Sequence, residues 1–332
     1  MKQISLILIF AIATTTTSSC TQDEENEASS REIRLSTSIV TPVLNRTADS
    51  GLSSWFAKDD KIGFSLWTAE NETLTAFHEN VPFVCTTAGS ETTNAAFATQ
   101  ETPILWPEGN EPCTLFAYYP YQETSPVVND KATVEVSTQQ QTGNNYSQSD
   151  FLTAQIDGQL PQAGTVYLNF LHRLSKVNFI LKNGKDINKP EDLLPATVIV
   201  TGMNTHGIIN LSTPITVSGQ STVAEITPAG SFTKTTYKTV PCLSGVKALV
   251  IPQTVAEGTV LFKLTINGKE YTYQANAGNA PTPTNVFESG TSYNFIFTLK
   301  KGAAGADELD VSCGIGKWNE AEDIEVDLEE KV

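Results

Sequence analysis

The chain has 332 residues, and its 21 lysines and arginines against 37 aspartates and glutamates give a formal net charge of −16. Because nucleic-acid binding requires clustered cations, this balance argues against a nucleic-acid partner. Hydrophobic residues make up 39% of the sequence, which is enough for a buried core. The three histidines lie far apart, and the common catalytic, metal-binding and phosphate-binding motifs do not occur. We therefore expect no enzyme activity, no cofactor and no metal site.

Residues 1–19 have the features of a lipoprotein signal peptide. Lys2 precedes the apolar run ISLILIFAIA (4–13), which is too short for a membrane span of ~20 residues. Cys20 follows small residues, as in a bacterial lipobox, and is the predicted site of lipid attachment. Ordinary secretion with cleavage nearby is the alternative. Residues 20–30 are acidic and polar, which predicts a flexible tether.

From residue 31 onward, apolar and polar residues alternate with the period of two that is typical of strands. In the first such segment the alternating apolar residues are Ile33, Leu35 and Ile39. Further strands are predicted at 166–170, 177–181, 248–253 and 291–299.

The segment LFKLTINGKEYTYQA (261–275) carries the clearest hairpin signal. Its Asn-Gly dipeptide is typical of a two-residue β-hairpin loop. Such a loop places Leu264 opposite Tyr271. It also places Phe262 opposite Tyr273, so that all four side chains share one face.

Short strands separated by glycine, proline and asparagine turns predict an all-β fold. Because the strands are too many for one small sandwich, we expect two tandem β-sandwich domains, with a boundary near IDGQLPQAG (156–164). The predicted parts are an N-terminal domain at 31–160, a C-terminal domain at 161–320 that includes a connector at 301–310, and an acidic strand or tail at 321–332.

Apart from Cys20, the cysteines are Cys85, Cys113, Cys242 and Cys313. An exported protein permits disulfides, and four cysteines allow three pairings. The sequence does not choose among them; Cys85 with Cys113 is the least demanding pair, and buried free thiols are the alternative.

Six blocks of sequence, in this order, resemble the Bacteroidetes fimbrillins, the family of Mfa-like and FimA-like pilins. They are WFAKDDKIGFSLW (55–67), FAYYPY (116–121), SDFLTA (149–154), FLHRLSKVNF (170–179), VIPQT (250–254) and ESGTSYNFIFTL (288–299). The acidic stretch after Cys20 resembles the surface-export signal of Bacteroidetes lipoproteins. The resemblance implies transthyretin-like topology in both sandwiches, and a lipoprotein at the outer membrane that becomes a fimbrial subunit supporting adhesion.

The resemblance also implies assembly by strand exchange. An arginine-specific protease cuts the subunit, its first strand leaves, and the open groove accepts a strand from another fimbrial subunit. The predicted leaving strand contains Ile33, Leu35 and Ile39, and Arg46 in the following polar loop is the predicted cleavage site. The alternative for Arg46 is an ordinary loop cation.

The predicted donor strand is DIEVDLEE (323–330), where Ile324, Val326 and Leu328 alternate with acidic residues. This pattern would suit insertion into a neighbour's groove. The alternatives are an edge strand of the chain's own second domain and a frayed acidic tail.

The aromatic run at 116–121 leaves a second function open. If Tyr118, Tyr119 and Tyr121 point to solvent, they could stack on sugar rings, and the protein would be a glycan-binding surface lipoprotein of a polysaccharide-utilisation system. The preferred interpretation places them in the core. We also expect His172 to be satisfied by a hydrogen bond near the junction of the domains.

Overall fold

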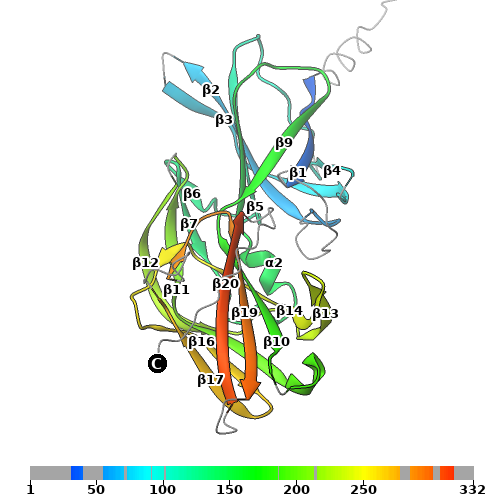
Figure 1. Ribbon diagram of the computed structural model, residues 1–332. Helices are drawn as coiled ribbons and strands as arrows, with labels where there is room; N and C mark the ends of the chain where they lie inside the picture. Colours follow the sequence, from blue (N-terminus) through cyan, green and yellow to red (C-terminus); the bar gives the residue numbers. More distant parts are fainter. Residues whose placement is uncertain are drawn as a thin grey trace, which may run out of the picture.

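The computed structural model describes residues 31–39, 55–70, 73–90, 92–100, 102–185, 187–212, 215–276, 285–301 and 307–317. The fold is all-β, as predicted, with 61% of the described residues in strands against 4% in helix. A closed barrel forms one end of the molecule, and a five-stranded and a six-stranded sheet form most of the other end (Figure 1). In the described part of the chain, no helix has the length and apolar composition of a membrane span.

Seven strands close the barrel. Their order around it is β1 (Arg34–Ile39), β4 (Ala95–Ala98), β3 (Thr73–Thr87), β2 (Lys61–Glu70), β5 (Cys113–Tyr119), β8 (Leu152–Gln159) and β9 (Thr165–His172). Most neighbours are antiparallel, but β1 and β9 run parallel. The first and last strands of this part of the chain therefore meet, and their contact closes the barrel.

The other end of the molecule contains two large sheets. The five-stranded sheet has the order β13 (Thr233–Tyr237), β14 (Val240–Val250), β10 (Ser175–Asn183), β19 (Thr291–Lys301) and β20 (Asp307–Lys317). The six-stranded sheet has the order β17 (Lys269–Gln274), β16 (Val260–Ile266), β11 (Ala196–Asn210), β7 (Lys131–Glu135) and β6 (Val127–Val128), with β12 (Thr216–Ile226) paired to β11. A short ladder joins β15 (Gln253–Thr254) to β18 (Val286–Phe287).

Two large hydrophobic clusters correspond to these two ends, and β5 contributes to both. Leu115 and Ala117 lie in the barrel core, whereas Phe116 and Tyr118 belong to the cluster of the two sheets. Successive side chains of a strand point to opposite faces, so one strand can serve two cores. The two ends of the molecule are therefore packed together through β5.

The chain passes between the two ends more than once. β6 and β7 pair in the sheet of β11, and the chain then returns to form β8 and β9 in the barrel. The predicted boundary at 156–164 covers the second half of β8 and the loop that leads to β9, and both strands belong to the barrel. The division into two tandem domains stays a prediction.

The sequence patterns of the second half are confirmed in detail. Phe262 pairs with Tyr273 and Leu264 with Tyr271 across the predicted hairpin. The loop residue Asn267 has a φ of 51°, as the two-residue turn requires. The predicted connector at 301–310 is wrong over its second part, because β20 begins at Asp307 and pairs with β19.

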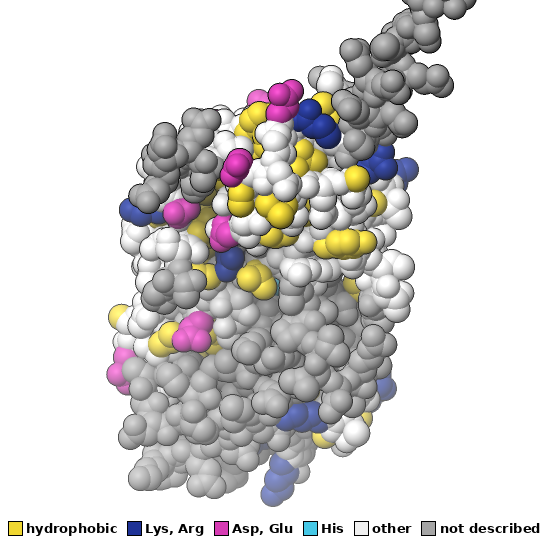
Figure 2. Space-filling view, turned by 90° about the horizontal axis from the view of Figure 1, so that it is seen from above, with side chains coloured by type: hydrophobic (Ala, Val, Ile, Leu, Met, Phe, Trp, Pro, Cys, Tyr) yellow, Lys and Arg dark blue, Asp and Glu magenta, His cyan; other side chains and the backbone are white. Residues whose placement is uncertain are grey.

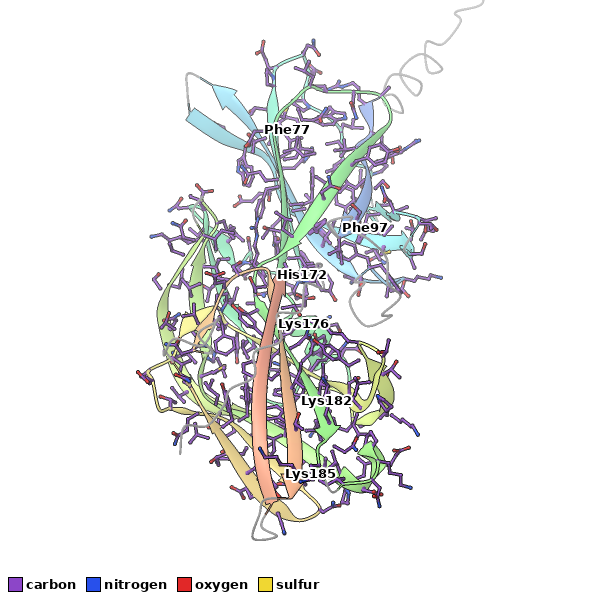
Figure 3. All side chains as sticks on the ribbon, in the orientation of Figure 1. Phe77, Phe97, His172, Lys176, Lys182 and Lys185 are labelled. Carbon is purple, nitrogen blue, oxygen red and sulfur yellow. The ribbon has the colours of Figure 1, made fainter. Side chains whose placement is uncertain are left out.

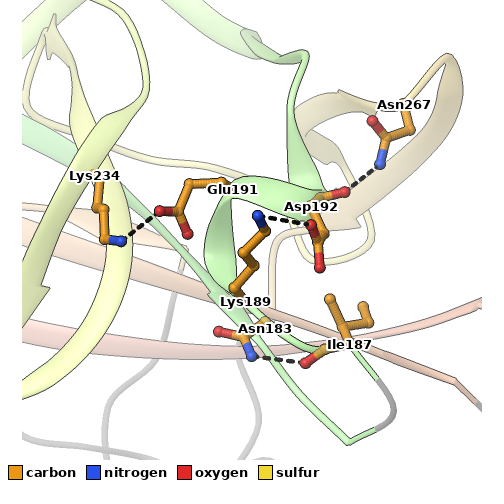
Figure 4. A network of polar contacts seen from close by, with 7 residues as sticks. All are labelled: Asn183, Ile187, Lys189, Glu191, Asp192, Lys234 and Asn267. Atoms are coloured by element: carbon orange, nitrogen blue, oxygen red, sulfur yellow. Dashed lines mark hydrogen bonds and ion pairs between the residues drawn. The ribbon is translucent and has the colours of Figure 1, made fainter.

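A short 3-10 helix, η1 (Pro190–Leu193), is tied to its surroundings by polar contacts (Figure 4). Lys234 Nζ lies 2.5 Å from Glu191 Oε1, and this contact lowers the pKa of Glu191. Asn267 Nδ2 donates to the Asp192 carbonyl over 2.7 Å. These contacts join η1 to β13 and to the turn of the β16–β17 hairpin.

Candidate functional site

The candidate functional site is the place of β1 in the barrel, because the sequence analysis predicts that this strand is the one exchanged. β1 pairs antiparallel with β4 through Leu35–Thr37 and parallel with β9 along its whole length, from Arg34 to Ile39. Both of its edges are therefore hydrogen-bonded. Removal of β1 would open the barrel and leave one edge each of β4 and β9 without a partner.

The side chains of β1 and of the residue before it alternate between core and surface. Ile33, Leu35, Thr37 and Ile39 are each 9% exposed or less, whereas Arg34 is exposed. This period of two follows from strand geometry, because alternate side chains point to one face. The predicted apolar residues of the first strand therefore do fill the barrel core; that the strand leaves stays a prediction.

The barrel core contains a group of aromatic rings in the same cluster as the inward side chains of β1. Phe56 packs edge-to-face on Phe97, with centroids 5.2 Å apart, and on Phe170, with centroids 5.0 Å apart. Phe97 lies in β4 and pairs with Leu35, while Phe170 lies in β9 and pairs with Ile39. Phe97 is labelled in Figure 3. A strand in this position therefore buries its inward side chains in the same cluster as rigid aromatic rings.

The residues just before β1 extend its pairing. Trp106 N–H donates to the Arg31 carbonyl and Ile33 N–H donates to the Ile104 carbonyl, both over 2.9 Å. Arg31 also donates from its guanidinium to the Trp106 carbonyl over 2.6 Å. An open hollow of about 360 Å³ lies beside this end of β1, between Arg31, Trp106 and Pro161. The start of the strand is thus tied to the barrel but borders open space.

The outer face of β1 has weaker ties. Arg34 forms an ion pair with Glu32 at 2.8 Å, and Ser38 shares a hydrogen bond of 2.8 Å with Asn169 of β9. Both contacts are exposed, and exposed ion pairs contribute little to stability. Within the described residues, β1 is therefore held mainly by its backbone ladders and by its buried side chains.

Several predicted site residues lie outside the described residues. They are the lipidation site Cys20, the cleavage site Arg46, and the donor residues Ile324, Val326 and Leu328. Their roles stay predictions. Arg46 follows β1 in the chain and precedes the next described residue, Trp55.

The aromatic run at 116–121 is largely buried. Tyr118 is 1% exposed and Tyr119 is 5% exposed, while Tyr121 is half-buried. Tyr118 Oη donates to Asn80 Oδ1 over 2.6 Å, and burial raises the pKa of Tyr119. The three tyrosines therefore do not form the exposed platform that the glycan-binding alternative requires.

The polar residues where β9 ends and β10 begins behave as structural groups. His172, labelled in Figure 3, is buried, and its Nδ1 lies 2.9 Å from Asp150 Oδ1, as predicted. Arg173 donates from Nε to Thr153 Oγ1 over 2.6 Å, and burial lowers the pKa of its guanidinium. No group of three or more His, Cys, Asp or Glu side chains among the described residues is arranged to hold a metal ion.

The pairing of Cys85 with Cys113 is wrong. Both side chains are buried free thiols, and they lie on β3 and β5, which are separated by β2. Cys85 Sγ donates to the Thr87 carbonyl and Cys113 Sγ to the Glu111 carbonyl. The sequence could not reveal this separation, because it depends on the order of the strands in the barrel.

Two further residues show the limits of the sequence pattern. Thr37 lies at an inward position of β1, as the alternation of Ile33, Leu35 and Ile39 indicates. The residues predicted for this strand were its apolar ones, so Thr37 was missed. Trp55 begins the first of the six blocks and is 47% exposed, although the next residue, Phe56, is buried. The sequence does contain a signal for Thr37, because this polar residue stands at an inward position of an otherwise apolar alternation.

A family model described as fimbrillin-like matches residues 45–318 of the sequence. The chain belongs to the fimbrillin-like family. This finding agrees with the six blocks of sequence that resemble these pilins. Membership implies a fimbrial protein at the cell surface.

Solved structures share the fold of this fimbrillin-like chain. A candidate cell adhesion protein from Bacteroides ovatus aligns with a TM-score of 0.61 and 22% identity, covering 87% of this chain and 98% of that one. A candidate cell adhesion protein from Bacteroides uniformis aligns with a TM-score of 0.59 and 20% identity, covering 86% of this chain and 98% of that one. At these identities the similarity supports the fold alone. No curated protein sequence matches the chain.

Proposed function

We propose that this chain is a structural subunit of surface fimbriae that assembles by strand exchange and supports adhesion. It is exported as a lipoprotein anchored in the outer membrane through Cys20. An arginine-specific protease cuts after Arg46 and releases β1. Segment 323–330 of another fimbrial subunit then fills the open position. We infer a structural role and no catalytic one.

The observation that carries the proposal is the place of β1 as the closing strand of the barrel. Its release would expose backbone N–H and C=O groups on β4 and β9 together with the apolar sites that Ile33, Leu35 and Ile39 fill. Only another strand with apolar residues at alternate positions satisfies both demands. Ile324, Val326 and Leu328 supply that spacing.

The position of the arginines also supports cleavage at Arg46. Arg34 lies inside β1, and Arg31 precedes it, so a cut after either residue would leave the strand joined to the rest of the chain. Arg46 is the first arginine after β1. A cut there separates the whole strand from the barrel and leaves Thr47 as the new N-terminus.

The test uses the chain from Thr21 to Val332, which keeps every described residue, and an arginine-specific protease. We expect a new N-terminus at Thr47 by Edman sequencing and a ladder of SDS-resistant oligomers by gel and size-exclusion chromatography. Arg46→Gln prevents both. A chain that is cut at Arg46 but stays monomeric and keeps its first strand would contradict the proposal.

The donor strand is tested by matched substitutions on its two faces. Val326→Asn places an amide on the apolar face and should abolish oligomers, whereas Asp327→Asn places the same side chain on the polar face and should leave them. Deletion of residues 320–332 should give a folded monomer. Oligomers that form equally well from all three chains would exclude the C-terminal segment as the donor.

A further inference from the structure

Thr37 is a polar residue in the apolar face of β1. Its side chain is 1% exposed, and in the register of the barrel it lies beside Ala95 of β4 and Leu168 of β9. Within the described part of the chain, its Oγ1 has no hydrogen-bond partner. A hydroxyl that loses its water without gaining another partner destabilises the folded state.

Other buried hydroxyls of the barrel are satisfied. Thr153 of β8 is also 1% exposed, but its Oγ1 accepts the hydrogen bond from Arg173. Ser65 of β2 is 8% exposed, and its Oγ accepts a hydrogen bond of 3.0 Å from the Asn80 N–H. An unpaired hydroxyl is therefore not a general property of this barrel, and it occurs on the strand that closes it.

The C-terminal segment has no such polar residue on its apolar face. Its inward series is Ile324, Val326 and Leu328. When these three residues are centred on Leu35, Thr37 and Ile39, Val326 takes the place of Thr37 whichever way the strand runs. Valine and threonine are both β-branched and both suit strands, so the exchange replaces the hydroxyl with a methyl group of similar size.

We propose that Thr37 sets the direction of strand exchange: its unpaired hydroxyl makes β1 a poorer occupant of the barrel than a strand with an apolar residue at that position. This inference rests on the proposed function, because it concerns which of two strands the same position prefers. Either occupant offers backbone N–H and C=O groups to β4 and β9, so the inference concerns the side chain that lies at the place of Thr37. The intact chain can thus fold with β1 in the barrel, but β1 occupies this place less stably than the donor strand would.

The first measurement is the stability of the intact chain from Thr21 to Val332 in guanidinium. Thr37→Val should raise the unfolding midpoint, with the ratio of folded to unfolded chain increased about tenfold, or about 1.4 kcal/mol. Thr153→Val should lower the midpoint, because it removes the partner of Arg173. Thr133→Val, at an exposed position of β7, controls for the strand preference of valine and should change little.

The second measurement follows displacement of β1 after cleavage at Arg46. The cut chain, dilute and with a labelled first fragment, is titrated with a peptide of residues 321–332. Thr37→Val in the chain should raise the peptide concentration for half-displacement about tenfold, and Val326→Thr in the peptide should do the same. An Asp327→Asn peptide is the control and should displace like the natural one.

The outcomes separate the inference from the proposed function. A midpoint that does not rise with Thr37→Val overturns the inference. A raised midpoint together with equal displacement of β1 from both chains also overturns the inference. The proposed strand exchange is not affected by that result. If the midpoint rises and the peptide displaces β1 from neither chain, the proposed function fails and the role of Thr37 in exchange fails with it.

Discussion

β1 and β10 occupy equivalent positions in the two ends of the molecule. β1 lies between an antiparallel neighbour, β4, and a parallel neighbour, β9. β10 likewise lies between the antiparallel β14 and the parallel β19. Their environments differ, since β10 is covered on both faces: Phe179 and Leu181 lie in the core between the sheets, and Ile180 is buried in a second cluster on the other side.

In the part of the chain that the structure describes, β1 is covered on one face only. Its inward residues are buried, but Arg34, Ser36 and Ser38 point outward and remain partly or fully exposed. Removal of β1 therefore uncovers one row of side-chain sites, whereas removal of β10 would uncover two. The same pairing pattern thus gives a strand buried on one face at one end of the molecule, which we propose is the one exchanged, and a strand buried on both faces at the other end.

The largest effect is expected in β10. Phe179 is fully buried and its ring packs on Phe262 with centroids 5.1 Å apart, so Phe179→Ala should lower the free energy of unfolding by about 3–5 kcal/mol. Guanidinium unfolding measures it, and Phe179→Leu provides a milder variant if the first does not fold. Phe77→Ala is the matched control, because Phe77 is 47% exposed on the surface of β3 (Figure 3). Equal effects of Phe179→Ala and Phe77→Ala would show that burial of the Phe179 ring in β10 does not stabilise the chain more than an exposed ring does.

The next effect is expected in β1. Leu35 is 2% exposed, and Leu35→Ala should lower the free energy of unfolding by about 2–4 kcal/mol, because it leaves a cavity in the barrel core. It should also speed the release of the cut first strand, measured by the loss of the fragment on size-exclusion chromatography. Leu171→Ala, on the exposed face of β9, is the control for both readouts. Release at an unchanged rate would show that Leu35 does not hold β1 in the barrel.

Cys85 reports on the barrel core beside β1. It pairs with Phe97 of β4, and burial, with Asp60 and Asp59 nearby, raises the pKa of its thiol to about 11. The folded chain should therefore resist iodoacetamide at Cys85 at pH 8, and labelling should rise after β1 is released. Mass spectrometry locates the modified cysteine.

The same shift has a consequence for stability. Since the pKa of Cys85 is higher in the folded chain than its ordinary value of 9.0, the stability linked to it is complete below pH 9 and is lost as the pH rises toward 11. Unfolding midpoints between pH 8 and pH 11 measure this loss. Cys85→Ala should remove that part of the pH dependence, and an unchanged profile would exclude the thiol as its source.

The smallest effect is expected at the ion pair between η1 and β13, in which Lys234 is exposed and Glu191 is partly exposed. Lys234→Met should return the pKa of Glu191 toward its ordinary range, with little change in the unfolding midpoint at pH 7. The lowered pKa adds stability above the unfolded value, and this is lost as the pH falls through the folded value. Midpoints at pH 7 and pH 4 test it, with Lys58→Met as the control at another exposed lysine. A large fall in the unfolding midpoint at pH 7 would show that this ion pair contributes more to stability than exposed ion pairs do.

The face in Figure 2 shows why composition alone cannot locate a site on this chain. Viewed from above, apolar side chains lie among polar ones and among charged side chains of both signs. The net charge of −16 argues against a nucleic-acid partner but indicates no particular surface. The candidate site came from the alternation in β1 and from the family resemblance.

The sequence alone determined the inward faces of several strands, among them β1, β9, β10 and β19, and the register of the hairpin at Asn267-Gly268. These features depend on neighbours along the chain: alternation assigns faces, and a two-residue loop fixes which residues are opposite each other. The inward residues Ile33, Leu35 and Ile39 belong to this group.

Tertiary structure decided which strands lie beside each other, because strand partners come from distant parts of the chain. It placed β1 beside β4 and β9, kept Cys85 apart from Cys113, and buried Tyr118. It also decided that the hydroxyl of Thr37 would lie in the barrel core with no hydrogen-bond partner among the described residues, whereas the hydroxyl of Thr153 accepts a hydrogen bond from Arg173. Hydrogen-bond partners depend on three-dimensional neighbours, and no pattern along the chain contains them.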